Sequence, residues 1–440
     1  MKINRLITRL PGRNLLAAAM AVAGMAAAPA VLAATSIEVW HALNSHNKDV
    51  FEDLVKQFNK DQKDVKVTLK SFDSLDAVEA ELVKEAKGKN APNLVQLDDH
   101  RSPDGVASRS YITPMHVLLA KYPIKNQQWY LSRSNSFARD EKGNLLAFPY
   151  MADIPVMFYN TEAFKTAGLT PTTPERSWEG LQGQLVTLAN NGSRHCPLVT
   201  DQVVSMNLEN LAAVNNQLYT SNNNGIGQKT NPAFLFDITY VRHLSLMISW
   251  VRSEIMVHPE LSVQAAQRFA DRECAVLISS SGNLGWFRKV KALDFGVSGL
   301  PYYPQVTKSP GNPFVGGSAF WAVHGRAAEQ DKATAAFLGW LAEPKRAAQW
   351  YQETGFLPLT KDAYNLTLDD YYKHLGQWQP LVAVYAKDPS ALNRGFRVRN
   401  YDKIKAMFNQ RLNNALKGQE PATVMLKSAS TEAGKLMQQR

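Results

Sequence analysis

The stretch Phe314-Val-Gly-Gly-Ser-Ala-Phe-Trp-Ala-Val-His-Gly325 places a pair of glycines directly before a short apolar run. Glycines at the entrance of a strand indicate that another backbone or a ligand approaches closely. The alternative is a bulge or loop exit, in which Gly316 and Gly317 only permit an unusual turn. The stretch is therefore a candidate binding point, and the rest of the chain has to separate the two interpretations.

The first 33 residues have the pattern of a secretory signal peptide. Four basic residues precede an apolar, alanine-rich run over residues 15–28, and Val31-Leu32-Ala33 is a small-residue cleavage site. No later stretch approaches the roughly 20 apolar residues that a membrane-spanning helix needs. No cysteine near the cleavage point offers a lipid anchor. We therefore expect a soluble exported protein that resides in the periplasm.

The composition of the remaining chain limits its class and its partners. Roughly 400 residues are enough for two domains with separate cores. Removal of the four basic residues of the signal lowers the formal net charge from +10 to +6. The Lys and Arg residues are scattered rather than gathered in a stripe, which argues against a nucleic-acid partner. The charge favours at most a modest preference for anionic ligands or membrane surfaces.

Cys196 and Cys274 are the two cysteines of the sequence. An even number in an oxidising compartment favours one disulfide that closes a long loop. Two buried free thiols are the alternative.

Strands and helices are predicted to alternate at the start of the mature chain. The pattern predicts strands at residues 36–41, 65–69 and 93–97, separated by helices at 47–58 and 75–87. This order favours an α/β fold with a mostly parallel sheet. Ligands bind beyond the carboxyl ends of such strands, which directs attention to residues 41–44, 71–74 and 98–101. Two further strands are predicted at 145–150 and 154–160, with a turn at 151–153.

A family resemblance begins in this part of the chain. The string Phe158-Tyr-Asn-Thr-Glu-Ala-Phe164, followed by Gly168-Leu169, Pro174 and Ser177-Trp178, resembles the signature of extracytoplasmic solute-binding proteins of ABC importers, in the sugar-binding family 1. Members of that family that bind sn-glycerol-3-phosphate are similar at residues 272–282, 315–318, 350–351, 354–360 and 394–397. The likeness keeps its order from about residue 37 to the C-terminus.

The resemblance implies two α/β lobes that close on a ligand in the cleft between them. Crossing segments are expected near residues 146–150, 307–313 and 356–359. The predicted ranges are 34–147 and 312–356 for lobe 1, and 148–311 and 357–440 for lobe 2. The implied protein is a monomer without cofactor or metal. It delivers a small solute to an inner-membrane ABC permease.

Ligand contacts follow from the resemblance, one position at a time. Ser280, Gly317 and Trp178 match ligand-binding positions of the family, and Asp99 stands where the family has a glutamate. Ser280 donates readily to a phosphate oxygen, and the ring of Trp178 suits the carbon skeleton of a polyol or sugar. The alternatives are a turn with a helix cap at residues 279–281 and a packing role for Trp178.

Other positions depart from the family pattern. Asp73 and Phe356 replace tyrosines and Asp153 replaces a serine, while Lys405 falls near a family arginine with Arg397 close by. Carboxylates beside a phosphate are unfavourable unless cations intervene. The departures therefore favour glycerophosphodiesters of choline or ethanolamine over sn-glycerol-3-phosphate, with a neutral sugar as the alternative. Asp73 and the other aspartates could equally be turn residues.

An enzyme is not expected. The sequence singles out no acid and base pair for glycoside hydrolysis, and the histidines lack metalloprotease spacing. Ser280 is outside a nucleophile-elbow motif, and no glycine-rich nucleotide loop is present.

Overall fold

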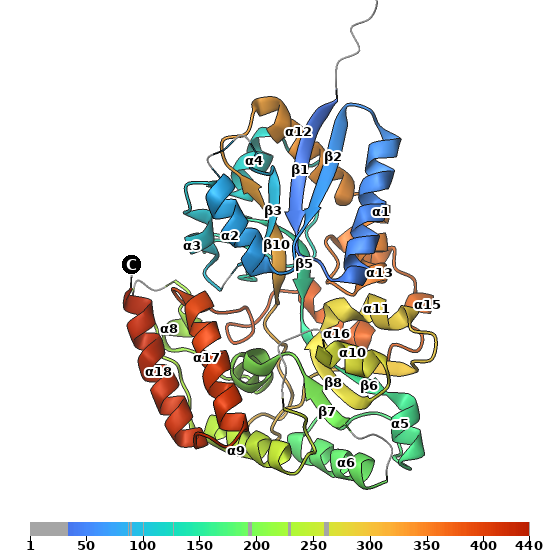
Figure 1. The fold of residues 1–440 in the computed structure, drawn as a ribbon, viewed down its shortest axis with the longest axis vertical. Coiled ribbons are helices and arrows are strands. Elements are labelled where there is room, and N and C mark those ends of the chain that lie inside the picture. Colours follow the sequence, from blue (N-terminus) through green and yellow to red (C-terminus); the bar gives the residue numbers. More distant parts are fainter. Residues whose placement is uncertain are drawn as a thin grey trace, which may run out of the picture. The chain divides into compact units, whose positions relative to one another are not determined.

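The computed structural model describes residues 34–439, except 87, 89, 100, 126, 192–195, 228–229 and 259–263. The expected signal peptide lies outside the described residues. Two sheets with helices packed on them organise the described chain (Figure 1), which confirms the predicted α/β class. Among these residues, no helix is both long enough and apolar enough to cross a bilayer.

The strands of the described chain are β1 Thr35–His41, β2 Val65–Ser71, β3 Leu94–Asp98, β4 Ile112–Thr113, β5 Phe148–Asp153, β6 Pro155–Asn160, β7 Cys196–Thr200, β8 Cys274–Ser280, β9 Phe295–Ser298 and β10 Gly316–Val323. The α-helices are α1 Ser45–Asp61, α2 Leu75–Glu85, α3 Pro103–Ala107, α4 Met115–Lys121, α5 Thr161–Thr166, α6 Trp178–Asn190, α7 Asn210–Val214, α8 Ser221–Asn224, α9 Ile238–Arg252, α10 Gln264–Ala270, α11 Leu284–Lys289, α12 Ala328–Leu341, α13 Pro344–Thr354, α14 Lys361–Asn365, α15 Asp369–Tyr372, α16 Trp378–Ala383, α17 Tyr401–Leu416 and α18 Ala422–Gln438. Short helical turns are η1 Ser205–Glu209, η2 Ser281–Asn283 and η3 Val384–Ala386.

The first sheet has the order β2-β1-β3-β10-β4, and β5 also pairs with β10. The strands β2, β1 and β3 are parallel, as the alternating pattern predicts. The strand β10 is antiparallel to β3, β4 and β5. The prediction of a mostly parallel sheet is therefore wrong for the part of the sheet in which β10 pairs with its neighbours. The reason is that β10 starts at the carboxyl end of β3, where Ser318 pairs with Asp98.

The second sheet has the order β7-β8-β6-β9, and β6 runs antiparallel to both of its neighbours. The turn predicted at residues 151–153 is wrong, because these residues continue β5. Since β5 pairs in the first sheet and β6 in the second, the chain passes between the sheets at Ile154. This crossing comes after the stretch 146–150 that the sequence indicated. The residue ranges of the two lobes stay a prediction.

Local sequence explains the helix that begins after β1. The side chain of Asn44 accepts a hydrogen bond from the backbone N–H of Asn47, which caps the first turn of α1. Phe51, Leu54 and Phe58 form its buried stripe with helical spacing. This stripe packs against α13 and β2. The cap fixes Asn44 directly beyond the carboxyl end of β1, where the sequence predicted a ligand-binding segment.

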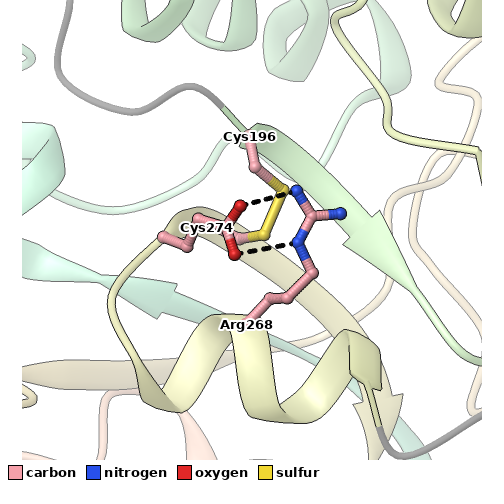
Figure 2. The surroundings of a disulfide bond; sticks show 4 residues. Cys196, Arg268 and Cys274 are labelled. Atoms are coloured by element: carbon pink, nitrogen blue, oxygen red, sulfur yellow. Dashed lines mark hydrogen bonds and ion pairs between the residues drawn. A yellow bond between two sulfur atoms is a disulfide. The ribbon is translucent and has the colours of Figure 1, made fainter.

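A disulfide joins Cys196 of β7 to Cys274 of β8, at a sequence separation of 78. The two cysteines are register partners in the parallel pair. Figure 2 shows the bond beside Arg268, whose Nε and Nη2 donate to the Glu273 carboxylate at 3.0 and 2.9 Å. The disulfide therefore fastens the outer strand of the second sheet.

Replacing both cysteines by alanine is expected to lower the free energy of unfolding by about 2–4 kcal/mol, because the unfolded chain gains freedom when a long loop opens. Denaturant unfolding of the double variant and the parent, each with and without a reducing agent, measures this loss. The reducing agent should lower the unfolding midpoint of the parent alone. Equal midpoints for parent and variant would contradict the expectation.

Candidate ligand-binding site

A cavity of about 320 Å³ lies between residues of the first and second sheets. Its volume is in the range of sites for small solutes. Loops and strand ends of the first sheet contribute Ala42, Leu43, Asn44, Gln96, Asp98, Arg101, Asp153, Gly316, Gly317 and Ser318. The second sheet, its loops and α17 contribute Pro155, Gln202, Ser205, Glu209, Ser280, Gly282, Asn283, Tyr401, Asp402 and Lys405. Phe314 and Phe356 add aromatic surface.

The two glycines at the start of β10 have different tasks. Gly317 has φ +89°, and a Cβ there would overlap the backbone oxygen of Met151 on the paired strand β5. Gly316 has an ordinary φ, but its Cβ would lie 2.9 Å from Nη2 of Arg101. Gly317 therefore permits close backbone pairing, and Gly316 leaves room for a guanidinium. Both glycines line the cavity, so the close-approach interpretation and the unusual-turn interpretation each describe part of this stretch.

Arg101 brings a positive charge into the cavity. Its φ of +48° lies in the left-handed region, which is uncommon for a bulky residue and is typical of functional sites. The Asp99 carboxylate accepts from the Arg101 backbone N–H at 2.9 Å and holds this conformation. The guanidinium donates to the Val315 carbonyl and lies 3.8 Å from Glu209. Arg101 is therefore oriented by the residue before β10 and by the turn η1.

Carboxylates outnumber cations among the described residues that line the cavity. Glu209 is buried and accepts a hydrogen bond from the Tyr401 hydroxyl at 2.8 Å. It ends the π-helical turn η1, and such turns are frequent at functional sites. The lining carboxylates are Asp98, Asp153, Glu209 and Asp402, against Arg101 and Lys405 as the lining cations. A ligand that carries both charges fits this balance better than a dianion does.

Asp153 and Ser280 meet at the point where the chain passes between the sheets. The Ser280 hydroxyl donates to Asp153 and accepts from the Gly282 backbone N–H at 3.0 Å, so this serine caps a turn and also lines the cavity. Burial raises the pKa of Asp153 to about 6, against the opposing effects of Ser280 and Arg101. Burial also raises the pKa of Asp201 to about 6, although Ser279 donates to it at 2.7 Å.

Stability is expected to fall as the pH rises from about 4 to 6. The folded protein still binds protons at Asp153 and Asp201 in this window, whereas carboxyl groups of the unfolded chain, with a usual pKa of about 4, have released them. The stabilising contribution is fully present below pH 4 and is lost as the pH rises through 6. Unfolding midpoints of Asp153→Asn and Asp201→Asn across this window should decline less steeply than those of the parent. Identical slopes in all three proteins would contradict this assignment.

Five of the residues predicted from the sequence line the cavity: Asp153, Ser280, Gly317, Phe356 and Lys405. Phe356 packs its ring on Trp350, with ring centroids 5.6 Å apart and the planes 19° from parallel. Lys405 is exposed on α17, one turn after Tyr401. The structure brings these residues together from both sheets.

The structure places four other predicted residues outside the lining of this cavity: Asp73, Asp99, Trp178 and Arg397. Asp73 is exposed after β2, and Asp99 is buried and accepts from the backbone N–H groups of Arg101 and Ala138. Their binding role stays a prediction.

Trp178 and Arg397, the other two of these four residues, contact buried rings and hydrogen-bond acceptors respectively. Trp178 is buried against His243 and Trp250, with ring centroids at 4.7 and 5.9 Å. Arg397 is almost buried and donates to the Asp104 carboxylate and to the Arg139 carbonyl. The contacts of Trp178 fit the packing role that the sequence left open.

Sequence reasoning did not single out Arg101 or Glu209. Arg101 ends the segment 98–101 that was expected to approach a ligand, so its position after β3 was the available signal. No pattern in the sequence pointed to Glu209, because this residue lines the cavity through the packing of η1. Among the described residues, no group of three or more His, Cys, Asp or Glu side chains is placed to hold a metal ion.

Relatives of known name match most of the chain. The sn-glycerol-3-phosphate-binding periplasmic protein UgpB of Rhizobium meliloti (strain 1021) is 28% identical over 400 residues, which cover 90% of this chain and 92% of the relative. UgpB of Escherichia coli O1:K1 / APEC is 27% identical over 426 residues, or 96% of each chain.

Solved structures show the same two-lobed fold. UgpB from Mycobacterium tuberculosis in complex with glycerophosphocholine superposes with a TM-score of 0.72 at 17% identity, over 92% of this chain and 99% of the other. Maltose-bound MalE3 of T. maritima also gives 0.72, at 14% identity over 92% and 100% of the two chains. The profile of the bacterial extracellular solute-binding protein family matches residues 53–377. The chain is therefore a member of the bacterial extracellular solute-binding protein family.

Proposed function

We propose that this chain is the periplasmic substrate-binding component of an ABC importer. It captures sn-glycerol-3-phosphate or a glycerophosphodiester and delivers it unchanged to a membrane permease. The names of its relatives support this assignment, since the matched UgpB proteins are called sn-glycerol-3-phosphate-binding. A signal peptide over residues 1–33, a monomeric state, closure of the two lobes and the lack of catalysis belong to the same proposal.

The observation that carries the proposal is the Arg101 guanidinium in a cavity lined from both sheets. An arginine fork matches the geometry of phosphate oxygens, and its strength increases where water is excluded. Lys405 supplies a second cation along the same cavity, whereas the Ser280 hydroxyl would have to release Asp153 before it could donate to a phosphate oxygen. A phosphodiester that contacts Arg101 and Lys405 would be held from both lobes.

The excess of carboxylates favours a diester with a positive head over the monoester. A phosphate dianion would face Asp98, Asp153 and Glu209, whereas a choline or ethanolamine group would be attracted to them. The substitution of serine by Asp153, relative to the family pattern, contributes directly to this preference.

A neutral sugar is the alternative solute. The ring of Phe356 lines the cavity and stacks on Trp350, which gives a flat apolar surface of the kind that sugar rings contact. Carboxylates next to such a surface accept hydrogen bonds from sugar hydroxyls without any phosphate.

Calorimetric titration of the ligand-free mature protein tests the proposal. The panel contains sn-glycerol-3-phosphate, glycerophosphocholine, glycerophosphoethanolamine and malto-oligosaccharides. We expect micromolar or tighter binding of the two diesters, with the monoester weaker, and recovery of each compound unchanged after long incubation. Binding of the sugars alone would replace the solute assignment, and chemical turnover of any compound would contradict the assignment as a receptor.

A further inference from the structure

A second cavity of about 330 Å³ adjoins the crossing between the two sheets. Pro155 lines it and also lines the first cavity, so the two spaces share one residue of the crossing. Its walls are largely apolar and rich in proline, and they include Ile154, Pro310, Pro313, Pro380, Leu381 and Val384. These residues come from the crossing at Ile154, from the stretch before β10 and from α16 with the turn η3.

Within the part of the chain that the structure describes, Arg176 is the one charged residue that lines this cavity. Nη2 of Arg176 donates to the Leu300 carbonyl at 3.3 Å, and Nε of Arg176 is buried without an acceptor. Among the described residues, no carboxylate forms an ion pair with Arg176, and burial lowers the pKa of its guanidinium. Gly299 leaves the room that Arg176 occupies, because a Cβ there would overlap Nη2. A cation that is half removed from water without a counter-charge is unfavourable unless an anion joins it.

Gln377, an exposed residue, also lines this cavity. The side-chain oxygen of Gln377 accepts from the Ser298 hydroxyl at 3.4 Å, which leaves the amide nitrogen to donate. A guanidinium binds a carboxylate through two parallel hydrogen bonds. The proline and leucine walls suit a short hydrocarbon body. The Arg176 guanidinium, the Gln377 amide and the apolar lining together match a compact molecule with one anionic end.

We propose that this cavity is a second ligand site, which takes a small apolar carboxylate with its anionic group on Arg176. The site lies on two segments that join the sheets: Ile154 and Pro155, and residues 310–313. The Tyr385 hydroxyl donates to the Pro313 carbonyl at 2.9 Å, and the following residue, Phe314, lines the first cavity. Occupancy of the second site therefore changes the affinity of the first site through these shared segments.

Hexanoate is the probe, and hexan-1-ol is its neutral control of similar size. Titration of the solute-free protein should show saturable binding of hexanoate, at least about tenfold tighter than hexan-1-ol because of the guanidinium. Arg176→Met should reduce hexanoate binding to the level of the alcohol. Leu381→Trp, which fills the cavity and keeps the charge, should abolish binding of both. Unfolding midpoints of both variants establish that they are folded.

The absence of saturable hexanoate binding to the parent would overturn the site, and so would unchanged binding in both variants. This titration needs no solute, so it fails or succeeds independently of the proposed function. Coupling is measured with whichever solute the calorimetric panel identifies. Saturating hexanoate should shift the affinity for that solute about fivefold or more in the parent and leave it unchanged in Leu381→Trp. An unshifted affinity in the parent would overturn the coupling.

Discussion

Replacing Arg101 by methionine is expected to weaken binding of glycerophosphocholine by about 100-fold, because a desolvated charge pair with the phosphate is lost. Methionine keeps much of the apolar length of arginine but removes the fork that Val315 and Glu209 orient. Arg101→Lys should recover only part of the affinity, since a point charge cannot form two parallel hydrogen bonds. Calorimetric titration of the three proteins measures the series.

Arg133→Met is the matched control, since Arg133 is exposed, lies outside the cavity lining and, among the described residues, donates to the Lys142 carbonyl alone, at 3.4 Å. It should bind like the parent. Glu209 loses its cation in Arg101→Met, so the unfolding midpoint of that variant has to be measured together with its affinity. A folded Arg101→Met protein that binds glycerophosphocholine as tightly as the parent would contradict the role of Arg101.

Gly317→Ala is expected to destabilise the protein by about 2–5 kcal/mol, combining the left-handed backbone cost of alanine with overpacking against β5. The clash is with the backbone oxygen of Met151, which the sheet holds in place. Denaturant unfolding measures the loss. Because β5 leads directly into the crossing at Ile154, solute binding should weaken as well.

Gly316→Ala is the matched variant on the neighbouring residue. Its Cβ would meet the end of the flexible Arg101 side chain, at 2.9 Å, rather than a backbone atom. We therefore expect a stability change within about 1 kcal/mol but a roughly tenfold loss of affinity for the diester. Equal effects of the two substitutions on stability would contradict the different roles of the two glycines, in which Gly317 permits backbone pairing and Gly316 leaves room for the Arg101 guanidinium.

The sequence predicted those features that depend on local pattern. Residues 314–325 indicated both a strand and a close approach, and β10 has both properties. The alternation at residues 36–97 predicted three strands and two helices that the structure contains. The direction of β10 could not be predicted in the same way, because it depends on the return of the chain from the second sheet.

The positions of side chains could likewise be predicted where they depend on local sequence, but not where they depend on distant parts of the chain. Trp178 follows a capping serine at the start of α6, and this local signal says nothing about α9, whose His243 and Trp250 enclose the ring. The position of Arg101 in the cavity depends on its ion pair with Glu209, which is distant in sequence. It also depends on a left-handed backbone conformation, which the identity of this residue does not predict. Asp153 and Ser280 were predicted separately, and only the pairing of β6 with β8 brings them together.

A crystal structure of the mature protein grown with glycerophosphocholine tests the central claim most directly. We predict the diester in the cavity between the two sheets, with a phosphate oxygen within hydrogen-bond distance of the Arg101 guanidinium and the choline group facing the carboxylates. A diester bound outside this cavity, or bound in it with the phosphate turned away from Arg101, would contradict the account.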